Sequence, residues 1–225
     1  MTDGPIAIVD VGVGNLRSVE RAVRHALGDS QRRVLFTGDP GAVREAATVV
    51  MPGQGGFGDC AMALSRDGGV LARALTDHIA AGRPYLGICL GLQVLFEGSE
   101  EAPGRGGLGV FRGTVRRFRE GATAEDGTPA KIPHVGWNRV VPREDNPGAV
   151  RWLPPGGGAW FYFVHSYFVV PADPSLVAAT STHGEAFTCA IARGALLGVQ
   201  FHPEKSQTAG ISLLQRFLGC GEASP

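Results

Sequence analysis

The sequence has no excess charge of either sign and no long apolar run. Its 225 residues include 21 Lys and Arg against 21 Asp and Glu. Such a balance gives no electrostatic footprint for nucleic acid or for an anionic membrane, so we expect neither as a partner. No run of eighteen apolar residues occurs, and the first residues lack the pattern of a signal peptide. We therefore expect neither a membrane span nor a secretion signal.

Cysteine is scarce and scattered. No two cysteines form a C-x-x-C pair, and none stands in a C-x-x-x-H pair. This spacing argues against a zinc knuckle and against a disulfide framework, so we expect no metal site. It fits a reducing cytoplasm, in which a single cysteine stays a thiol. The four cysteines are Cys60, Cys89, Cys189 and Cys220.

The chain does have short apolar runs that alternate with helical periodicity. Predicted strands lie at 6–11, 33–36, 48–51, 85–89, 110–118, 160–170, 177–181, 187–192 and 197–201. Predicted helices lie at 15–27, 43–46, 69–81, 90–97 and 206–218. This order predicts one α/β domain over 1–225, with a mostly parallel central sheet, flanking helices and an antiparallel extension. The last five residues should fray, and we assign no function to the loops at 121–129 and 154–158.

A cysteine flanked by glycines stands where the predicted strand 85–89 changes directly into a helix. Residues 87–91, GICLG, have the spacing G-x-C-x-G around Cys89. A nucleophile at a sharp strand-to-helix turn needs small residues two positions away on each side, because larger ones would clash as the backbone folds back. The helix N-terminus also favours a thiolate. Taken alone, the motif fits a buried core cysteine equally well.

A histidine and a glutamate follow the last predicted strand. His202 and Glu204 are two residues apart, so in an extended segment their side chains point to the same side, and Pro203 keeps that segment extended. Such a pair can activate a thiol, with the imidazole as base and the carboxylate fixing its tautomer. Alone, the two would be a solvated pair at a strand end. Together with Cys89 they indicate a catalytic triad.

A glycine-rich loop follows the third predicted strand. Residues 52–56, PGQGG, stand at the carboxyl end of a parallel strand, the edge where open α/β sheets bind ligands. With the amide of Leu90, the loop could stabilise a tetrahedral oxyanion. The alternative interpretation is a flexible turn.

These motifs together resemble the class I (triad) glutamine amidotransferases, whose fold is flavodoxin-like. The resemblance rests on segments 87–93 and 202–204 and covers nearly the whole chain. It implies hydrolysis of the L-glutamine side-chain amide through a thioester at Cys89, without a cofactor. It assigns the oxyanion hole to Leu90, Gly53 and Gln54, and substrate binding to Gln93, Gly55, His165, Ser166 and Tyr167. The family usually has a small apolar residue where Gln54 stands.

Four further segments resemble the glutaminase subunits of imidazole glycerol phosphate synthases. They match together and in order, which makes them more specific than the triad. This resemblance implies a heterodimer with a (β/α)8-barrel cyclase that uses the ammonia in histidine biosynthesis, making imidazole glycerol phosphate and an aminoimidazole carboxamide ribotide. It assigns the partner interface to Asn15, Trp137, Asn138 and Lys205. The segments are 10–19, 131–138, 161–167 and 202–206.

The chain itself shows no site for a phosphorylated acceptor. Gly12 and Gly14 open a helix after a strand, but Arg17 stands where a dinucleotide fingerprint has its third glycine. Ammonia is protonated in water. A chain that makes ammonia but has no acceptor site is therefore expected to pass it to a partner protein through a route closed to water. Trp137 could instead be a core residue and Lys205 a solvated charge. We interpret His25 and His78 as exposed on helix faces.

Three alternatives stay open. The chain could be the glutaminase of another triad amidotransferase, such as that of vitamin B6 synthesis or a fused GMP-type enzyme. It could be a stand-alone thiol hydrolase of similar fold, which would act without a barrel. It could also be a catalytically silent regulatory or scaffold subunit, although degenerate members typically lose the thiol.

Overall fold

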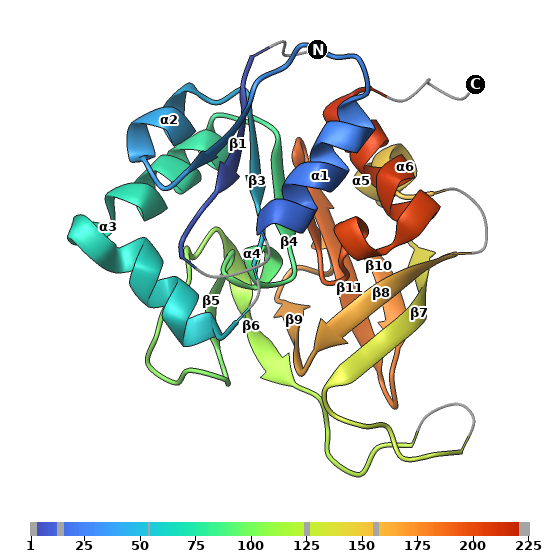
Figure 1. The fold of residues 1–225 in the computed structure, drawn as a ribbon. Helices are drawn as coiled ribbons and strands as arrows, with labels where there is room; N and C mark the ends of the chain where they lie inside the picture. The colour runs from blue at the N-terminus through green and yellow to red at the C-terminus, as the bar shows by residue number, and fades with distance from the viewer. Residues whose placement is uncertain (1–3, 13–15, 54, 124–126, 155–157, 221–225) are drawn as a thin grey trace.

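The computed structural model describes residues 4–12, 16–53, 55–123, 127–154 and 158–220. The predicted α/β architecture is confirmed: twelve strands form one mixed sheet with helices on its faces (Figure 1). Along the main path, five parallel strands come first and four antiparallel strands follow. The parallel strands, in spatial order, are β2 (Val34–Thr37), β1 (Ile6–Val9), β3 (Thr48–Met51), β4 (Tyr85–Ile88) and β12 (Leu196–Val199).

The antiparallel extension continues from β12. Its strands are β11 (Ala186–Arg193), β10 (Val177–Thr182), β7 (His134–Pro142) and β8 (Ala159–His165). A branch off this path consists of β5 (Phe96–Ser99), β6 (Phe111–Arg117) and β9 (Tyr167–Pro171). β9 joins the branch to the main sheet by pairing with β11.

Helices cover both faces of the parallel half, which explains why its strands are continuous apolar runs. Every residue of β1, β3, β4 and β12 is buried, including the polar Thr48 at the start of β3. Ile6 and Ile8 pack with one set of helices, while Ala7 and Val9 pack with the other. The first set is α1 (Leu16–Leu27), α5 (Pro147–Trp152) and α6 (Gln207–Leu218); the second includes α2 (Pro40–Glu45) and α3 (Phe57–Ala80). The alternation along β1 therefore divides the core into two layers.

Some predicted elements differ from the observed ones. α3 consists of two helical segments separated by the non-helical residues 66–69, of which Asp67, Gly68 and Gly69 have positive φ; the expected helix 69–81 corresponds to the second segment, and the first was not predicted. The expected helix 90–97 stops early: α4 spans Leu90–Gln93, and Phe96 begins β5. The expected strand 160–170 is divided at Ser166 into β8 and β9.

The sequence interpretation also missed two elements and placed one buried histidine on the surface. The sequence interpretation assigned neither β7 nor α5. His25 is exposed as expected, whereas His78 is fully buried, because its Nε2 lies 2.9 Å from the Pro84 carbonyl oxygen under the turn that ends α3. Short 3-10 helices, η1 (Pro174–Leu176) and η2 (Pro203–Lys205), complete the described structure. Among the described residues, no helix combines the length and the apolar character needed to cross a membrane.

Candidate active site

Cys89 lies on the sharp turn between β4 and α4. Its backbone has φ 53° and ψ −103°, a conformation that side-chain-bearing residues rarely adopt. A Cβ on Gly87 would lie 2.4 Å from the Gly91 carbonyl oxygen, and a Cβ on Gly91 would lie 1.9 Å from the Met51 carbonyl oxygen. Both positions must therefore be glycine, which is the physical reason for the G-x-C-x-G spacing.

His202 and Glu204 reach the same edge of the sheet from the neighbouring strand. β12 runs parallel to β4, and the Cys89 amide donates to the Val199 carbonyl at 2.7 Å. The segment after His202 is not extended as expected, because Pro203 begins the 3-10 helix η2; even so, Nδ1 of His202 lies 2.7 Å from Oε1 of Glu204. Both side chains are almost completely buried. Within the described structure Nε2 of His202 has no hydrogen-bond partner, so this nitrogen is available to the thiol or to a substrate.

The site favours the charged form of the imidazole. Burial lowers the pKa of His202, but the neighbouring Cys89 and the hydrogen-bonded Glu204 outweigh burial and raise the pKa to about 9. A raised imidazole pKa beside a cysteine is what a thiolate–imidazolium pair requires. The three predicted triad side chains therefore lie in one electrostatically coupled group.

A cavity of about 420 Å³ opens over this group. Its lining includes Cys89 and His202 together with all five residues that the resemblance assigns to substrate binding: Gly55, Gln93, His165, Ser166 and Tyr167. These residues come from segments that are far apart in the sequence. The cavity volume suits a small molecule such as an amino acid.

The loop after β3 lies directly against the start of α4. A Cβ on Gly53 would be 2.3 Å from Cβ of Leu90 and 3.0 Å from the Gly91 amide nitrogen. The first amides of a helix have no intrahelical acceptor, so the Leu90 amide can serve an oxyanion. Gly53 and Leu90 are thus neighbours, as an oxyanion hole needs. Gln54, the third residue of that prediction, lies outside the described residues.

His165 belongs to a directional chain of hydrogen bonds. Its Nδ1 lies 2.9 Å from the Tyr167 carbonyl oxygen, which can only accept, so Nδ1 carries the proton. Its Nε2 then accepts from Nδ1 of His134 at 3.2 Å, and Nε2 of His134 accepts from the Asn138 amide, also at 3.2 Å. Burial, followed by the charge of neighbouring histidines, lowers the pKa of His134 and His165 to about 3. Both rings are therefore neutral, and His165 walls the cavity without acting as an acid or base.

The sequence interpretation missed two residues near the nucleophile. Glu101 lines the cavity, and its Oε2 accepts the Phe57 amide at the start of α3 at 2.8 Å. Nothing distinguished it in the sequence, because it stands in an acidic run that looks like a solvated loop. Gln200 is completely buried and donates from Nε2 to Sγ of Cys89 at 3.4 Å. Its position in the sequence, two residues before the predicted base His202, was the only available signal.

The residues predicted for a partner interface differ in their surroundings. Trp137 is 44% exposed on β7 and so is not a core residue. Asn138 donates to the Thr182 carbonyl oxygen as well as to His134. Lys205 lines the candidate cavity, with its Nζ 5.8 Å from the Tyr162 ring centre. Asn15 lies outside the described residues.

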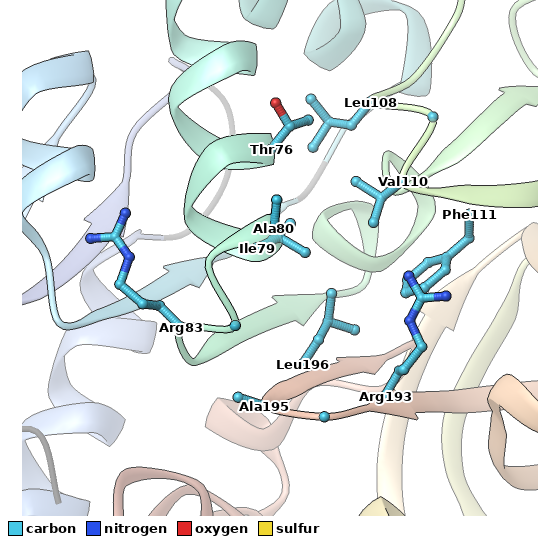
Figure 2. A pocket seen from close by; sticks show the side chains of 13 residues that line it. Thr76, Ile79, Ala80, Arg83, Leu108, Val110, Phe111, Arg193, Ala195 and Leu196 are labelled. Atoms are coloured by element: carbon cyan, nitrogen blue, oxygen red, sulfur yellow. The ribbon is translucent and has the colours of Figure 1, made fainter.

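A larger cavity, of about 630 Å³, lies at the opposite edge of the sheet, where β4 and β12 begin. Figure 2 shows its side chains: Arg193 lies against Phe111, while Arg83 points away. The Arg193 guanidinium is 4.4 Å from the Phe111 ring centre, and Arg83 donates to the Arg44 and Ala46 carbonyls. The lining contains no cysteine, histidine or carboxylate. This cavity therefore has no group for nucleophilic or acid–base chemistry of the kind found around Cys89.

No group of three His, Cys, Asp or Glu side chains in the described part of the chain is placed to hold a metal ion. The chemistry that the site supports rests on its own side chains. A thiol, a buried imidazole–carboxylate pair and free helix-start amides can perform acyl transfer from an amide.

Comparisons with known proteins agree with this geometry. The family model for class-I glutamine amidotransferases matches residues 7–219. The chain is 47% identical over 215 residues to imidazole glycerol phosphate synthase subunit HisH of Methylococcus capsulatus, covering 95% of each chain. It is 46% identical over 219 residues to the subunit of the same name of Nitrosospira multiformis, covering 97% of this chain and 98% of the relative.

Solved structures show the same fold at low sequence identity. A crystal structure of a glutamine amidotransferase superposes with a TM-score of 0.67 at 18% identity, covering 95% of this chain and 97% of that one. The glutaminase domain of Trypanosoma brucei CTPS, with bound acivicin, has a TM-score of 0.67 at 19% identity, covering 96% and 92%. With the family match over almost the full length, these similarities establish that the chain belongs to the class I glutamine amidotransferase family.

Proposed function

We propose that this chain is the glutaminase subunit of an imidazole glycerol phosphate synthase. It hydrolyses L-glutamine to glutamate and ammonia and delivers the ammonia to a cyclase partner in histidine biosynthesis. Relatives of that name, 44–47% identical over nearly their full length, support the assignment. The observation that carries it is that Cys89 and His202 line one cavity of amino-acid size, while Glu204 is bonded to His202 behind it.

The chemistry begins with proton transfer from the Cys89 thiol to Nε2 of His202. The sulfur attacks the side-chain amide carbon of glutamine, and the carbonyl oxygen becomes an oxyanion that the Leu90 amide and the 52–55 loop stabilise. As the C–N bond breaks, His202 returns its proton to the leaving nitrogen, which departs as ammonia. Water then attacks the thioester, again with His202 as base, and releases glutamate and the thiol.

Glu204 acts on His202 and not on the substrate. Its Oε1 holds the Nδ1 proton, which leaves Nε2 facing the thiol and stabilises the imidazolium that forms. Because both side chains are buried, this interaction is little screened by solvent.

Glu101 gives the cavity a charge that suits the free amino acid. One carboxylate oxygen is bonded to the Phe57 amide, which fixes the side chain at the cavity wall. The other oxygen can accept from the α-ammonium group of glutamine. A substrate without that group, such as a simple amide, would lose this interaction.

The proposed partner is a (β/α)8-barrel cyclase in a heterodimer. The antiparallel pair β7 and β8 supports this part of the proposal, because Trp137 and Trp160 are 44% and 58% exposed and Val135 and Val141 are exposed beside them. A contiguous apolar surface of this kind is typical of a protein interface. We also propose a cytoplasmic location, since the four cysteines are all free thiols.

The test is an assay of ammonia and glutamate release from glutamine. The chain is assayed alone, with a barrel cyclase, and with the cyclase and its nucleotide ligand. We expect strong stimulation in the complete complex and no turnover after Cys89→Ala, while Cys220→Ala, at an exposed thiol, keeps wild-type activity. Full activity of the isolated chain would support a stand-alone hydrolase, and turnover by Cys89→Ala would remove the nucleophile assignment.

A further inference from the structure

Gln200 is a buried polar side chain in contact with the nucleophile, and the mechanism above does not use it. It is fully buried, and its main-chain amide donates to the Cys189 carbonyl at 2.8 Å. Its side-chain Nε2 donates to Sγ of Cys89 at 3.4 Å. Its Oε1 accepts from Nε2 of Gln93 at 3.1 Å. Gln200 therefore connects the nucleophile to Gln93, whose side chain lines the glutamine cavity.

A main-chain carbonyl dictates the direction of this connection. Nε2 of Gln93 donates to the Tyr167 carbonyl oxygen at 3.0 Å, and a carbonyl oxygen can only accept. The amino group of Gln93 is thus fixed, so the Gln200 atom beside it must be the acceptor, Oε1. The other end of the Gln200 amide, the donor Nε2, is then turned toward the sulfur. The reverse orientation would face two donors together and leave the sulfur beside an oxygen.

A fixed donor at the sulfur has two effects. A hydrogen bond to an anion is stronger than one to the neutral form, so Nε2 favours the thiolate over the thiol. It also restrains the position of the sulfur on a backbone turn that is already constrained by Gly87 and Gly91. Gln200 and His202 stand two residues apart directly after β12, so this one segment supplies both the base and the donor.

We propose that Gln200 is a positioning residue for the reaction: its amide holds the Cys89 thiolate and links it, through Gln93, to the occupancy of the glutamine cavity. This proposal rests on the proposed function, with Cys89 as the nucleophile. It assigns to the buried glutamine a role that neither a hydrocarbon nor a carboxylate of the same length can fill.

The test compares Gln200→Met with wild type in a Cys220→Ser background, which removes the exposed thiol; Cys60 and Cys189 are buried. The rate of Cys89 alkylation by iodoacetamide is measured on the full chain over a range of pH, without glutamine or partner. We expect the rate near neutral pH to fall about tenfold, the order expected for losing one hydrogen bond to a charged group, and the rate profile to move to higher pH. In the complex with the cyclase, kcat for glutamine falls while KM changes little.

Gln200→Glu provides a second variant, because it keeps an oxygen acceptor for Gln93 but sets a carboxylate at the sulfur. We expect slower alkylation than in Gln200→Met, since the carboxylate repels the thiolate. Gln31→Glu makes the same charge change at an exposed position and should match wild type. Thermal unfolding of each variant checks the fold, and Gln200→Asn, too short to span both partners, replaces Gln200→Met if that variant does not fold.

The outcomes separate this proposal from the function on which it rests. Alkylation of Gln200→Met at the wild-type rate with an unchanged pH profile overturns the positioning role, even if the wild-type complex hydrolyses glutamine. Equal losses in both variants without any change in the pH profile also overturn it, because they indicate a structural role only. A wild-type complex that releases no ammonia from glutamine overturns the proposed function, whereas the alkylation comparison still decides the contact between Gln200 and Cys89.

Discussion

At the scale of single residues, the nucleophile depends on neighbours that have no side chain. Cys89 holds a left-handed backbone conformation that costs on the order of 1–3 kcal/mol, and the surrounding structure must impose it. Gly87 and Gly91 allow this because the turn closes onto main-chain oxygens that could not make room for a methyl group. The thiol is consequently presented by backbone geometry before any substrate binds.

Gly91→Ala should therefore destabilise the turn. Its new Cβ would meet the Met51 carbonyl oxygen at 1.9 Å, so β3 and α4 would have to separate. We expect the free energy of unfolding to fall by about 1–3 kcal/mol or more, together with most of the glutaminase activity. Urea denaturation and ammonia release measure the two effects.

The matched control for Gly91→Ala is Gly106→Ala. A Cβ there would lie 3.6 Å from its nearest neighbour, the Glu97 carbonyl oxygen, which is ordinary contact. Gly91→Ala with the stability and activity of this control would show that the turn does not need a glycine.

The residues around Cys89 also show which parts of a site can be predicted from sequence. Gly87, Cys89 and Gly91 are near neighbours, so their spacing expresses a local steric need. Gln200 and Cys89 are 111 positions apart, and Glu101 contacts Phe57 across 44 positions. Contacts of that kind depend on which strands become neighbours, which no local pattern specifies.

At the scale of elements, η2 carries Glu204 and is supported by the first turn of α6. The Ser206 hydroxyl donates to the His202 carbonyl at 2.6 Å, and a Cβ on Gly210 would lie 1.9 Å from the Pro203 carbonyl oxygen. α6 thus begins directly against the segment that holds the catalytic base and its carboxylate. The distance between His202 and Glu204 depends on this close contact.

Gly210→Ala should accordingly reduce catalysis without removing substrate binding. The added methyl group would push η2 away from α6 and weaken the bond between Nδ1 of His202 and Oε1 of Glu204. We expect kcat in the complex to fall at least several-fold with little change in KM. Steady-state kinetics test this against Gly98→Ala, whose nearest contact would be an ordinary 3.6 Å. An unchanged kcat would mean that η2 is held independently of α6.

Element prediction from the sequence succeeded where one periodicity continued and failed where it changed. The buried strands β1, β3 and β4 are uniform apolar runs, and the predictions found them. The segment 90–97 is mostly apolar, so a helix pattern and a strand pattern were both possible, and pairing of Phe96 with Phe111 decided for a strand. Ser166 separates β8, which ends at His165, from β9, which begins at Tyr167. The run of strand-forming residues shows no turn signal at this point, so the division is not visible in the sequence.

At the scale of the whole molecule, the antiparallel half is built around neutral histidines. His134 stacks on His183 with ring centres 4.1 Å apart and on Phe163 at 4.9 Å, and it shares a hydrogen bond with His165. Burial, with the charge of nearby histidines, lowers the pKa of His134 and His165 to about 3. The unfolded chain therefore binds protons at these rings more readily than the folded chain does. The free energy of unfolding must then depend on pH.

Stability should fall on acidification below the ordinary histidine pKa. Between about pH 6 and pH 4 the unfolded chain binds protons at His134 and His165 that the folded chain does not bind. The two groups together then lower the free energy of unfolding by roughly 2.7 kcal/mol per pH unit. His134→Gln should reduce this slope by about half, and His25→Gln, at an exposed histidine, should leave it unchanged. Urea denaturation at a series of pH values measures the slope; equal slopes in wild type and His134→Gln would contradict the prediction.

At alkaline pH the free energy of unfolding should change with the opposite sign and fall as pH rises. The folded pKa of His202, about 9, lies above its unfolded value of about 6.5, so its contribution is complete below 6.5 and is lost as pH rises toward 9. We expect the free energy of unfolding to be greatest near neutral pH. In His202→Gln the decline between about pH 7 and pH 9 should be weaker, and a decline as steep as in wild type would remove His202 as its cause.

The position of β12 has a consequence for how the protein is made. β12 lies in the middle of the sheet, between β4 and β11, although it is the last of the described strands in chain order. A ribosome must therefore complete β12, at Leu196–Val199, before the two halves of the sheet can join. The residues directly after β12 include His202 and Glu204, so a chain released before this point would carry the reactive sulfur without the groups that activate it. Aborted translation should yield fragments that aggregate or are degraded, and none that liberates ammonia away from its acceptor.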